Sequence, residues 1–222
     1  MNKVTMIWMC DKIPNYEILH KLYTTIRSPE EKMLNVNEDF KIWNDGRKIY
    51  IIMDSDKIQG KRNYTFMSGD KSVNIKHLAT NDFELPVYKK GQIIKLSAVL
   101  SYSHKHYKGE NKFIESCPVN MDGKFKKDLK RPFINYLEKN TGLIFSSITE
   151  DTSRLRFERI FNDEKSIYEK LELNKKVYFK NIISLQAVLE IDDPVKVSEL
   201  SYKMLGKKRS YGLGNFIVEI YE

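Results

Sequence analysis

Cysteine and long apolar runs are scarce in this sequence, and each absence excludes a class of protein. Two cysteines, Cys10 and Cys117, in 222 residues do not make a disulfide framework, and without a CxxC spacing they do not make a zinc site. No apolar run approaches the ~18–20 residues that a membrane span needs. The run Met6–Cys10 is stopped by Asp11 and Lys12 with no small-residue cleavage site after it, so we expect no secretory signal. These absences indicate a reduced, cytoplasmic protein without a membrane partner.

The composition is that of a globular protein with a basic second half. Hydrophobic residues make up 41% and charged residues 31%, and the length suits one large domain or two small ones. The net charge is +8, yet residues 1–88 hold 13 Lys/Arg against 12 Asp/Glu, whereas residues 89–222 hold 25 against 18. A basic, aromatic-rich half favours a polyanionic partner such as nucleic acid. A codon preference for lysine and asparagine explains this positive charge about as well as a nucleic-acid partner does.

Periodicity predicts a strand, a helix and further strands in the first half. The predicted strand is Val4–Met9 and the helix Tyr16–Arg27, whose apolar residues follow a helical spacing. Asp45-Gly46 is a hairpin signal between two short strands, and residues 54–80 are weakly patterned. The later strands are expected at Phe40–Asn44, Lys48–Met53 and Asp82–Tyr88. This order suits a small ferredoxin-like, or RRM-like, unit.

The second half repeats a similar order of elements. We expect strands at Ile93–Tyr102, Leu143–Ile148, Arg154–Phe161, Lys176–Glu190 and Phe216–Tyr221. We expect helices at Lys127–Asn140 and Asp193–Leu205, and a basic loop at His104–Lys112. The predicted fold class is therefore α+β, with two tandem ferredoxin-like domains at residues 1–88 and 89–222.

The first predicted helix carries a candidate acid–base site. At about 100° per residue, Tyr16, His20, Tyr23 and Arg27 fall within an arc of roughly 60°, away from the apolar stripe. An imidazole takes or gives a proton near neutral pH. Tyrosine hydroxyls orient or hydrogen-bond a phosphate, and arginine holds one. The alternative is an ordinary exposed histidine on a surface helix.

A glycine loop near the end of the chain suggests a phosphate site. Its glycines let a backbone approach a phosphate closely, and its cations add attraction. The alternative is a tight helix-to-strand turn with solvated lysines. The residues concerned are Gly206, Lys207, Lys208, Arg209, Gly212 and Gly214.

Basic residues on two neighbouring predicted strands suggest an RNA-binding hairpin. Alternate residues of a strand share a face, which places Arg154 with Arg156 and makes Lys176 and Lys180 neighbours on the next strand. A basic hairpin tracks the phosphates or enters a groove of RNA, and Lys105 lies in the basic loop. Lys41 and Lys48 lie in the nearly neutral half, so changing them is expected to affect RNA binding much less. The alternative is a solvated surface.

Together these segments resemble the CasE family, the CRISPR repeat-processing endoribonucleases of type I-E Cascade. The residues that carry the resemblance are 15–22, 90–96, 133–139, 184–190 and the loop 206–214, in the family's order. The resemblance implies two ferredoxin-like domains and cleavage of a CRISPR repeat at the base of its stem. It implies attack by the upstream 2′-hydroxyl without metal or small-molecule cofactor, and a crRNA that stays bound among other Cascade subunits.

The resemblance also assigns the site residues. The family's helix histidine falls on His20, and its usual tyrosine position, three residues earlier, holds Glu17 here. Tyr16 and Tyr23 are therefore the two candidates to assist His20. Two other functions stay open, namely a non-catalytic RNA-binding subunit and a structural subunit that touches RNA only through its Cascade neighbours.

Overall fold

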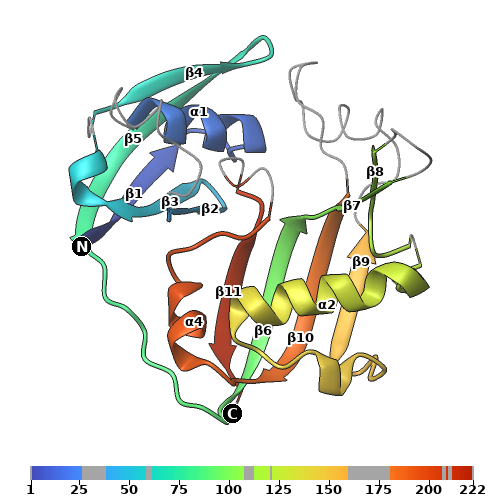
Figure 1. Ribbon diagram of the computed structural model, residues 1–222. Helices are drawn as coiled ribbons and strands as arrows, with labels where there is room; N and C mark the ends of the chain where they lie inside the picture. The colour runs from blue at the N-terminus through green and yellow to red at the C-terminus, as the bar shows by residue number, and fades with distance from the viewer. Residues whose placement is uncertain are drawn as a thin grey trace.

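The computed structural model describes residues 2–26, 39–58, 62–107, 113–120, 122–159, 181–206, 209 and 212–221. For 104–107 and 113–116 it describes the backbone only. Figure 1 shows two antiparallel sheets, the first built from the N-terminal half and the second from the C-terminal half. The chain passes from one to the other between Asp82 and Ile93. The predicted α+β fold of two ferredoxin-like units is confirmed.

The first sheet has the strand order β2-β3-β1-β5-β4, and among the described residues one α-helix lies on one of its faces. Alternate residues of β1 are buried because they point at the helix, α1; Met6 and Trp8 are the largest of them. The apolar stripe of α1, including Ile18 and Leu22, closes this core. The elements are β1 (Lys3–Cys10), α1 (Tyr16–Ile26), β2 (Lys41–Asp45), β3 (Lys48–Asp54), a 3₁₀ turn (Ser55–Lys57), β4 (Tyr64–Ser68) and β5 (Lys71–Asp82).

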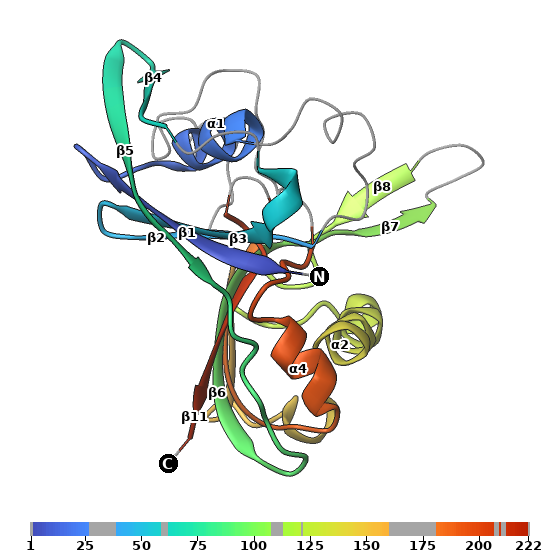
Figure 2. The same ribbon diagram turned by 90° about the vertical axis from the view of Figure 1, so that its left-hand side faces the viewer.

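The second sheet has the order β11-β6-β10-β9, and both of the helices among its described residues lie on the same face (Figures 1 and 2). Phe133 of α2 and Leu185 of β10 are fully buried between sheet and helices. The opposite face, which we call the open face, bears no helix among the described residues. The elements are β6 (Ile93–Ser101), α2 (Lys127–Thr141), a 3₁₀ turn (Ser146–Ile148), β9 (Leu155–Arg159), β10 (Ile182–Glu190), α4 (Pro194–Glu199) and β11 (Asn215–Ile220). A separate hairpin pairs β7 (His104–Tyr107) with β8 (Phe113–Ser116).

The two sheets meet where the edge strands β2 and β11 approach each other. Lys41 of β2 is only 7% exposed, and its ammonium donates to the carbonyl oxygens of Leu200 and Phe216, at 2.9 and 2.8 Å. Those carbonyls belong to the second half, so one buried lysine bridges the two halves. Burial lowers the pKa of Lys41 to about 8. Lys41 is therefore a buried residue between the two halves, and the prediction that it matters little for RNA binding stays a prediction.

Several predicted elements differ from the structure for identifiable reasons. Residues 83–88 form no strand, because the strand that pairs with β1 is β5, which ends at Asp82. The alternating pattern of β5 is weak in the sequence because many of its residues are exposed or only partly buried.

In the second half, Leu143–Ile148 is not a strand. The carboxylate of Glu138 accepts hydrogen bonds from the backbone N–H groups of Phe145 and Ser146, and a 3₁₀ turn follows. The expected basic loop at 104–112 begins instead as strand β7 (His104–Tyr107), and residues 108–112 lie outside the described residues. The last helix is shorter than expected, ending at Glu199.

No helix in the part of the chain that the structure describes has the length and apolar character needed to cross a membrane.

Candidate nucleic-acid interface

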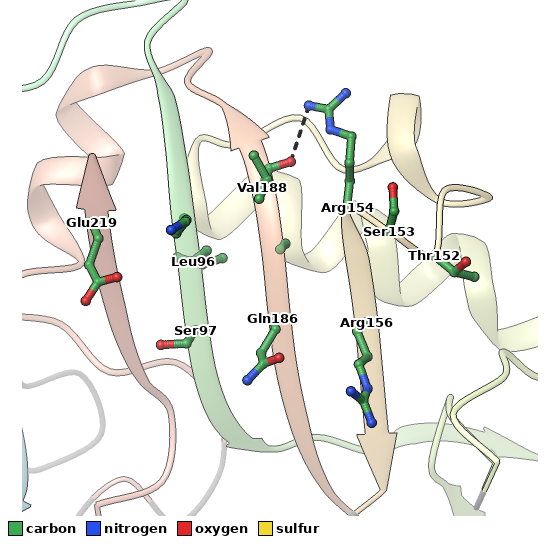
Figure 3. A pocket seen from close by; sticks show the side chains of 11 residues that line it. Leu96, Ser97, Thr152, Ser153, Arg154, Arg156, Gln186, Val188 and Glu219 are labelled. Carbon is green, nitrogen blue, oxygen red and sulfur yellow. Dashed lines mark hydrogen bonds between the residues drawn. The ribbon is translucent and has the colours of Figure 1, made fainter. Parts of the chain in front are cut away.

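The open face of the second sheet carries a groove of about 560 Å³ (Figure 3). Inward residues of the strands fill the core, so their outward neighbours line this groove. Arg156, Gln186 and Ser97 lie in register across β9, β10 and β6. The other charged lining residues are Lys95, Arg154 and Glu219. Guanidinium, amide and hydroxyl groups in one groove suit a phosphate backbone.

Two arginines place the positive charge at the β9 side of the groove. Arg154, just before β9, and Arg156, on β9, are both exposed and both line the groove (Figure 3). The Arg154 guanidinium donates to the Val188 carbonyl oxygen at 3.3 Å, which holds it over β10. A guanidinium fork presents several N–H donors to a phosphate in fixed geometry. The structure therefore brings these two predicted residues together on one surface.

A second hollow of about 330 Å³ extends the groove to the first half of the protein. It shares Ser97 and Gln186 with the first, so the two hollows adjoin. Its far wall comes from Tyr16 of α1, Trp43 of β2 and Gly212 of the glycine loop. The groove thus connects the predicted acid–base helix to the predicted arginines.

Helix α1 begins where Asn15 caps it, and its first turns are held by polar contacts. The Asn15 side chain accepts from the Ile18 N–H at 3.0 Å and donates to the Ser68 hydroxyl at 2.8 Å. Glu17 is 7% exposed and pairs with Lys21 at 2.7 Å. At the position of the family's tyrosine, this chain therefore has a carboxylate engaged within the helix.

Tyr16 and His20 stand one turn apart on the same side of α1. Tyr16 lines the groove and is partly buried, and burial raises the pKa of its hydroxyl, so this group stays protonated at neutral pH. His20 is also partly exposed, and its carbonyl oxygen accepts from the Thr24 hydroxyl at 2.9 Å. A neutral hydroxyl donor thus lines one end of the groove, and His20, one helical turn further along α1, is not among the lining residues.

The prediction that Tyr23 belongs to the polar strip is wrong. Tyr23 is 3% exposed and stacks on Phe40 with ring centroids 4.0 Å apart. Its place on the helix lies between Tyr16 and the apolar residue Leu19, and the Phe40 ring draws it into the core of the first half. The geometry therefore favours Tyr16 over Tyr23 as the partner of His20.

The three glycines of the loop have a packing reason for being glycine. Gly206, Gly212 and Gly214 have φ between +85° and +87°. A Cβ on Gly214 would lie 1.8 Å from the Leu205 carbonyl oxygen, and one on Gly212 would lie 2.9 Å from the Leu19 side chain of α1. The loop glycines approach protein atoms at these points, as the tight-turn alternative expects, and Gly212 also lines the groove.

Other predicted RNA-binding residues lie in different settings. Arg209 is partly buried, with its guanidinium 5.5 Å from the centre of the Phe40 ring. Lys105 belongs to β7, where only the backbone is described. The predictions for Arg27, Lys176, Lys180, Lys207 and Lys208 fall outside the described residues.

The side chains that the structure describes include no cluster of three or more His, Cys, Asp or Glu residues placed to hold a metal ion. Both cysteines are free and buried, and burial raises the pKa of Cys10 to about 12. A thiol with so high a pKa is a poor ligand and nucleophile.

Sequence reasoning missed the part of the groove contributed by β2, β6, β10 and β11. Trp43, Asn44 and Asn215 line it, together with Ser97 and Gln186. The signal was present, because polar residues alternate with apolar ones along 93–101 and 182–190. The alternation does not reveal that the edge of the other sheet meets the same face.

Comparison with solved structures identifies the fold. Two structures described as the CRISPR endoribonuclease Cse3 bound to a 19-nucleotide RNA match with TM-scores of 0.57 and 0.51. They cover 97% and 98% of this chain and 98% and 99% of their own, at 11% identity. This chain has the Cse3 fold. A Thermus thermophilus Cse3 bound to an RNA that represents a pre-cleavage complex agrees, with TM-score 0.53, 11% identity, and coverage of 96% of this chain and 98% of that one.

Comparison of sequences does not detect the similarity to Cse3 that the fold shows. No protein-family model matches the chain, and no curated protein matches it at a significant level. The expected resemblance to the CasE endoribonucleases is therefore confirmed at the level of the fold.

Proposed function

We propose that this protein is a CRISPR repeat endoribonuclease that binds an RNA stem-loop and cuts it at the base of the stem. The observation that carries the proposal is the pair of adjoining hollows, which extends from Tyr16 of α1, one turn from His20, to Arg154 and Arg156. The Cse3 fold supports it, since Cse3 itself is described as an endoribonuclease bound to RNA.

The proposed reaction is an intramolecular transesterification. The 2′-oxygen upstream of the scissile phosphate forms a bond to phosphorus while the bond to the 5′-oxygen breaks. The 2′-hydroxyl loses a proton and the leaving 5′-oxygen gains one, which yields a 2′,3′-cyclic phosphate and a 5′-hydroxyl. His20 exchanges the proton, and the Tyr16 hydroxyl donates to the phosphate. Cations and backbone N–H groups stabilise the developing charge.

The binding surface and the assembly follow from the same proposal. Arg154 and Arg156 hold phosphates, and the predicted residues Arg27, Lys105, Lys176, Lys180, Lys207, Lys208 and Arg209 extend the contact. The product crRNA stays bound and the protein works beside other Cascade subunits. No metal ion or small-molecule cofactor takes part.

Incubation of the protein with an end-labelled repeat hairpin in EDTA tests this proposal. We expect a single cut at the base of the stem, an upstream product ending in a 2′,3′-cyclic phosphate and a downstream product with a 5′-hydroxyl. A strict Mg²⁺ requirement with a 5′-phosphate product rejects the 2′-hydroxyl mechanism. A tight uncut complex instead identifies a non-catalytic RNA-binding subunit, and neither cutting nor binding identifies a structural one.

A further inference from the structure

One buried lysine joins the two halves of the protein by two directed hydrogen bonds. The Lys41 ammonium donates to the carbonyl oxygens of Leu200 and Phe216, at 2.9 and 2.8 Å. Leu200 follows the last residue of α4, and Phe216 lies on the edge strand β11. Backbone carbonyls at a helix end or on a sheet edge often lack a partner within their own element. Because the two acceptors belong to different elements, the pair of bonds fixes a direction as well as a distance.

Two further polar contacts between the halves constrain their arrangement less. The Lys203 ammonium lies 3.4 Å from the Asp39 carboxylate, but both side chains are partly exposed, and exposed ion pairs contribute little. The Ile42 N–H lies 3.2 Å from the Met204 sulfur, which is a weak acceptor. Of these three contacts, that of Lys41 combines burial with short bonds to strong acceptors.

Stability alone does not explain a charged side chain at this place. Lys41 is 7% exposed, and its ammonium lies 5.6 Å from the centre of the Trp43 ring. Taking an ammonium out of water costs free energy that its hydrogen bonds repay only in part, and an apolar side chain of similar volume is often as stable. An apolar side chain does not, however, make a directed bond to the other half. The lysine is therefore suited to fixing geometry rather than to raising stability.

Packed elements connect Lys41 to both ends of the groove. Ile42, the next residue of β2, belongs to the same core as Leu19 of α1. Phe216 belongs to the second sheet, whose order leads from β11 through β6 and β10 to β9, where Arg156 lies. A rotation of one half against the other at Lys41 therefore moves α1 relative to Arg156.

We infer that Lys41 is a positioning residue, which fixes the two halves so that RNA bound by Arg154 and Arg156 presents its scissile phosphate to His20. The inference rests on the proposed function for the roles of His20 and the arginines, whereas the fixing of the halves does not depend on RNA. Lys41 itself contacts neither the RNA nor the reacting atoms. Its loss therefore lowers the rate of cleavage more than the affinity, because the phosphate contacts of the second half remain.

The first test of Lys41→Met compares rate with affinity. Cleavage of the repeat hairpin is measured under single-turnover conditions at saturating protein, and affinity is measured with a hairpin that carries 2′-deoxyribose at the cut site. We expect the rate to fall by about 10-fold or more, since a small misplacement of reacting groups is costly. The affinity should change by less than about 3-fold, because phosphate contacts dominate it.

The second test measures the placement of the halves without RNA, as the distance distribution between two spin labels. Lys76→Cys on β5 and Lys139→Cys on α2 place one label on an exposed position of each half, and both native cysteines are buried. We expect one narrow distribution with Lys41 in place and a broader or shifted one in Lys41→Met. A general loss of stability does not change this distribution as long as the protein is folded.

Lys57→Met is the matched control. Lys57 lies 3.5 Å from Asp54 within the first half, and Asp54 keeps the Lys3 ammonium at 2.8 Å when Lys57 is removed. This variant should change neither measurement. Lys41→Arg keeps a cation with several N–H donors and is expected to restore the narrow distribution and most of the rate. If Lys41→Met fails to fold, Lys41→Gln, which keeps N–H donors on a shorter side chain, is expected to change both measurements in the same direction by less.

The outcomes separate this inference from the proposed function. An unchanged distance distribution in Lys41→Met overturns the inference, and so does a wild-type cleavage rate or a loss of affinity as large as the loss of rate. Cleavage by the wild type supports the endoribonuclease in each of these cases. If the wild type does not cleave, the proposed function is rejected, and the distance distribution still decides whether Lys41 fixes the two halves.

Discussion

Tyr16 and His20 illustrate how little separates a surface residue from a site residue on one helix. Both are partly exposed, while Tyr23, one turn further along, is buried against Phe40. Their difference arises from neighbours in other elements, since a helical wheel places all three within one arc. At this scale, chemistry depends on which side chain the core leaves accessible.

His20→Ala is expected to lower the single-turnover cleavage rate by at least ~100-fold, the usual contribution of positioned acid–base catalysis. Affinity for the repeat hairpin should change little, because phosphate contacts dominate such interfaces. Quenched time courses and a filter-binding titration measure the two quantities.

The matched control for this change is His77→Ala. His77 lies on β5, where its ring contacts Trp8 and its Nε2 lies 3.0 Å from the Thr80 hydroxyl oxygen. Loss of this histidine is expected to leave the cleavage rate of the folded protein near the wild-type value. A wild-type rate in His20→Ala rejects the catalytic assignment.

Lys41 makes the stability of the protein depend on pH. Its pKa is lowered to about 8 by burial in the folded protein and is near 10.4 in an unfolded chain. Between these values the unfolded chain binds more protons, so the contribution of Lys41 to stability rises with pH across this window, by roughly 3 kcal/mol in all.

Lys41→Met is expected to abolish that contribution. The difference in unfolding free energy between wild type and variant, measured by urea titration at pH 7, 8, 9 and 10, should move in favour of the wild type as the pH rises. Lys48→Met, on the exposed start of β3, is the control and should leave the pH dependence unchanged. A constant difference between wild type and Lys41→Met contradicts the prediction.

At the scale of elements, the glycine loop holds α1 against the second half. The Gly212 site contacts Leu19, and the Ile42 N–H lies 3.2 Å from the Met204 sulfur. The backbone N–H of Gly214 donates to the Val99 carbonyl oxygen on β6. The loop therefore contacts both α1 of the first half and β6 of the second.

Gly214→Ala is expected to destabilise the protein more than Gly46→Ala does. Both positions have positive φ, +87° at Gly214 and +55° at Gly46. Strain of about 1–3 kcal/mol is therefore common to them. Only Gly214 adds a clash, because its Cβ would meet the Leu205 carbonyl oxygen, whereas a Cβ at Gly46 meets nothing within 4 Å. Thermal unfolding of both variants measures the difference, and equal shifts contradict the packing explanation.

At the scale of the whole molecule, charge and shape together define the proposed RNA surface. The net charge of +8 lies mostly in residues 89–222, and the second sheet presents part of it in the groove. The first half contributes aromatic and amide groups at the other end of the same groove. The second half alone lines the arginine end, whereas both halves line the hollow at the other end.

Neutralising Arg154 and Arg156 together is expected to weaken hairpin binding and to flatten its salt dependence. Each lost phosphate contact lowers the log–log slope by up to about one unit, because fewer condensed counterions are released. The double variant Lys48→Ala/Lys76→Ala, at two exposed positions of the first sheet, should have a much smaller effect. Titrations of each double variant with the hairpin at two salt concentrations measure both quantities. Equal affinities and equal salt slopes for the two double variants would identify the arginines as a solvated surface without RNA contacts.

The local pattern of the sequence determined α1, the Asp45-Gly46 hairpin, and the strands β6 and β10, because each buries an apolar face with its own period. It also determined that Arg154 and Arg156 share a face. Tertiary structure alone decided that Lys41 is buried between the halves, that Tyr23 belongs to the core, and that Trp43 and Asn215 share a pocket with Tyr16. Those facts depend on contacts between residues up to 175 positions apart, and periodicity within one element contains no information about which other element it meets.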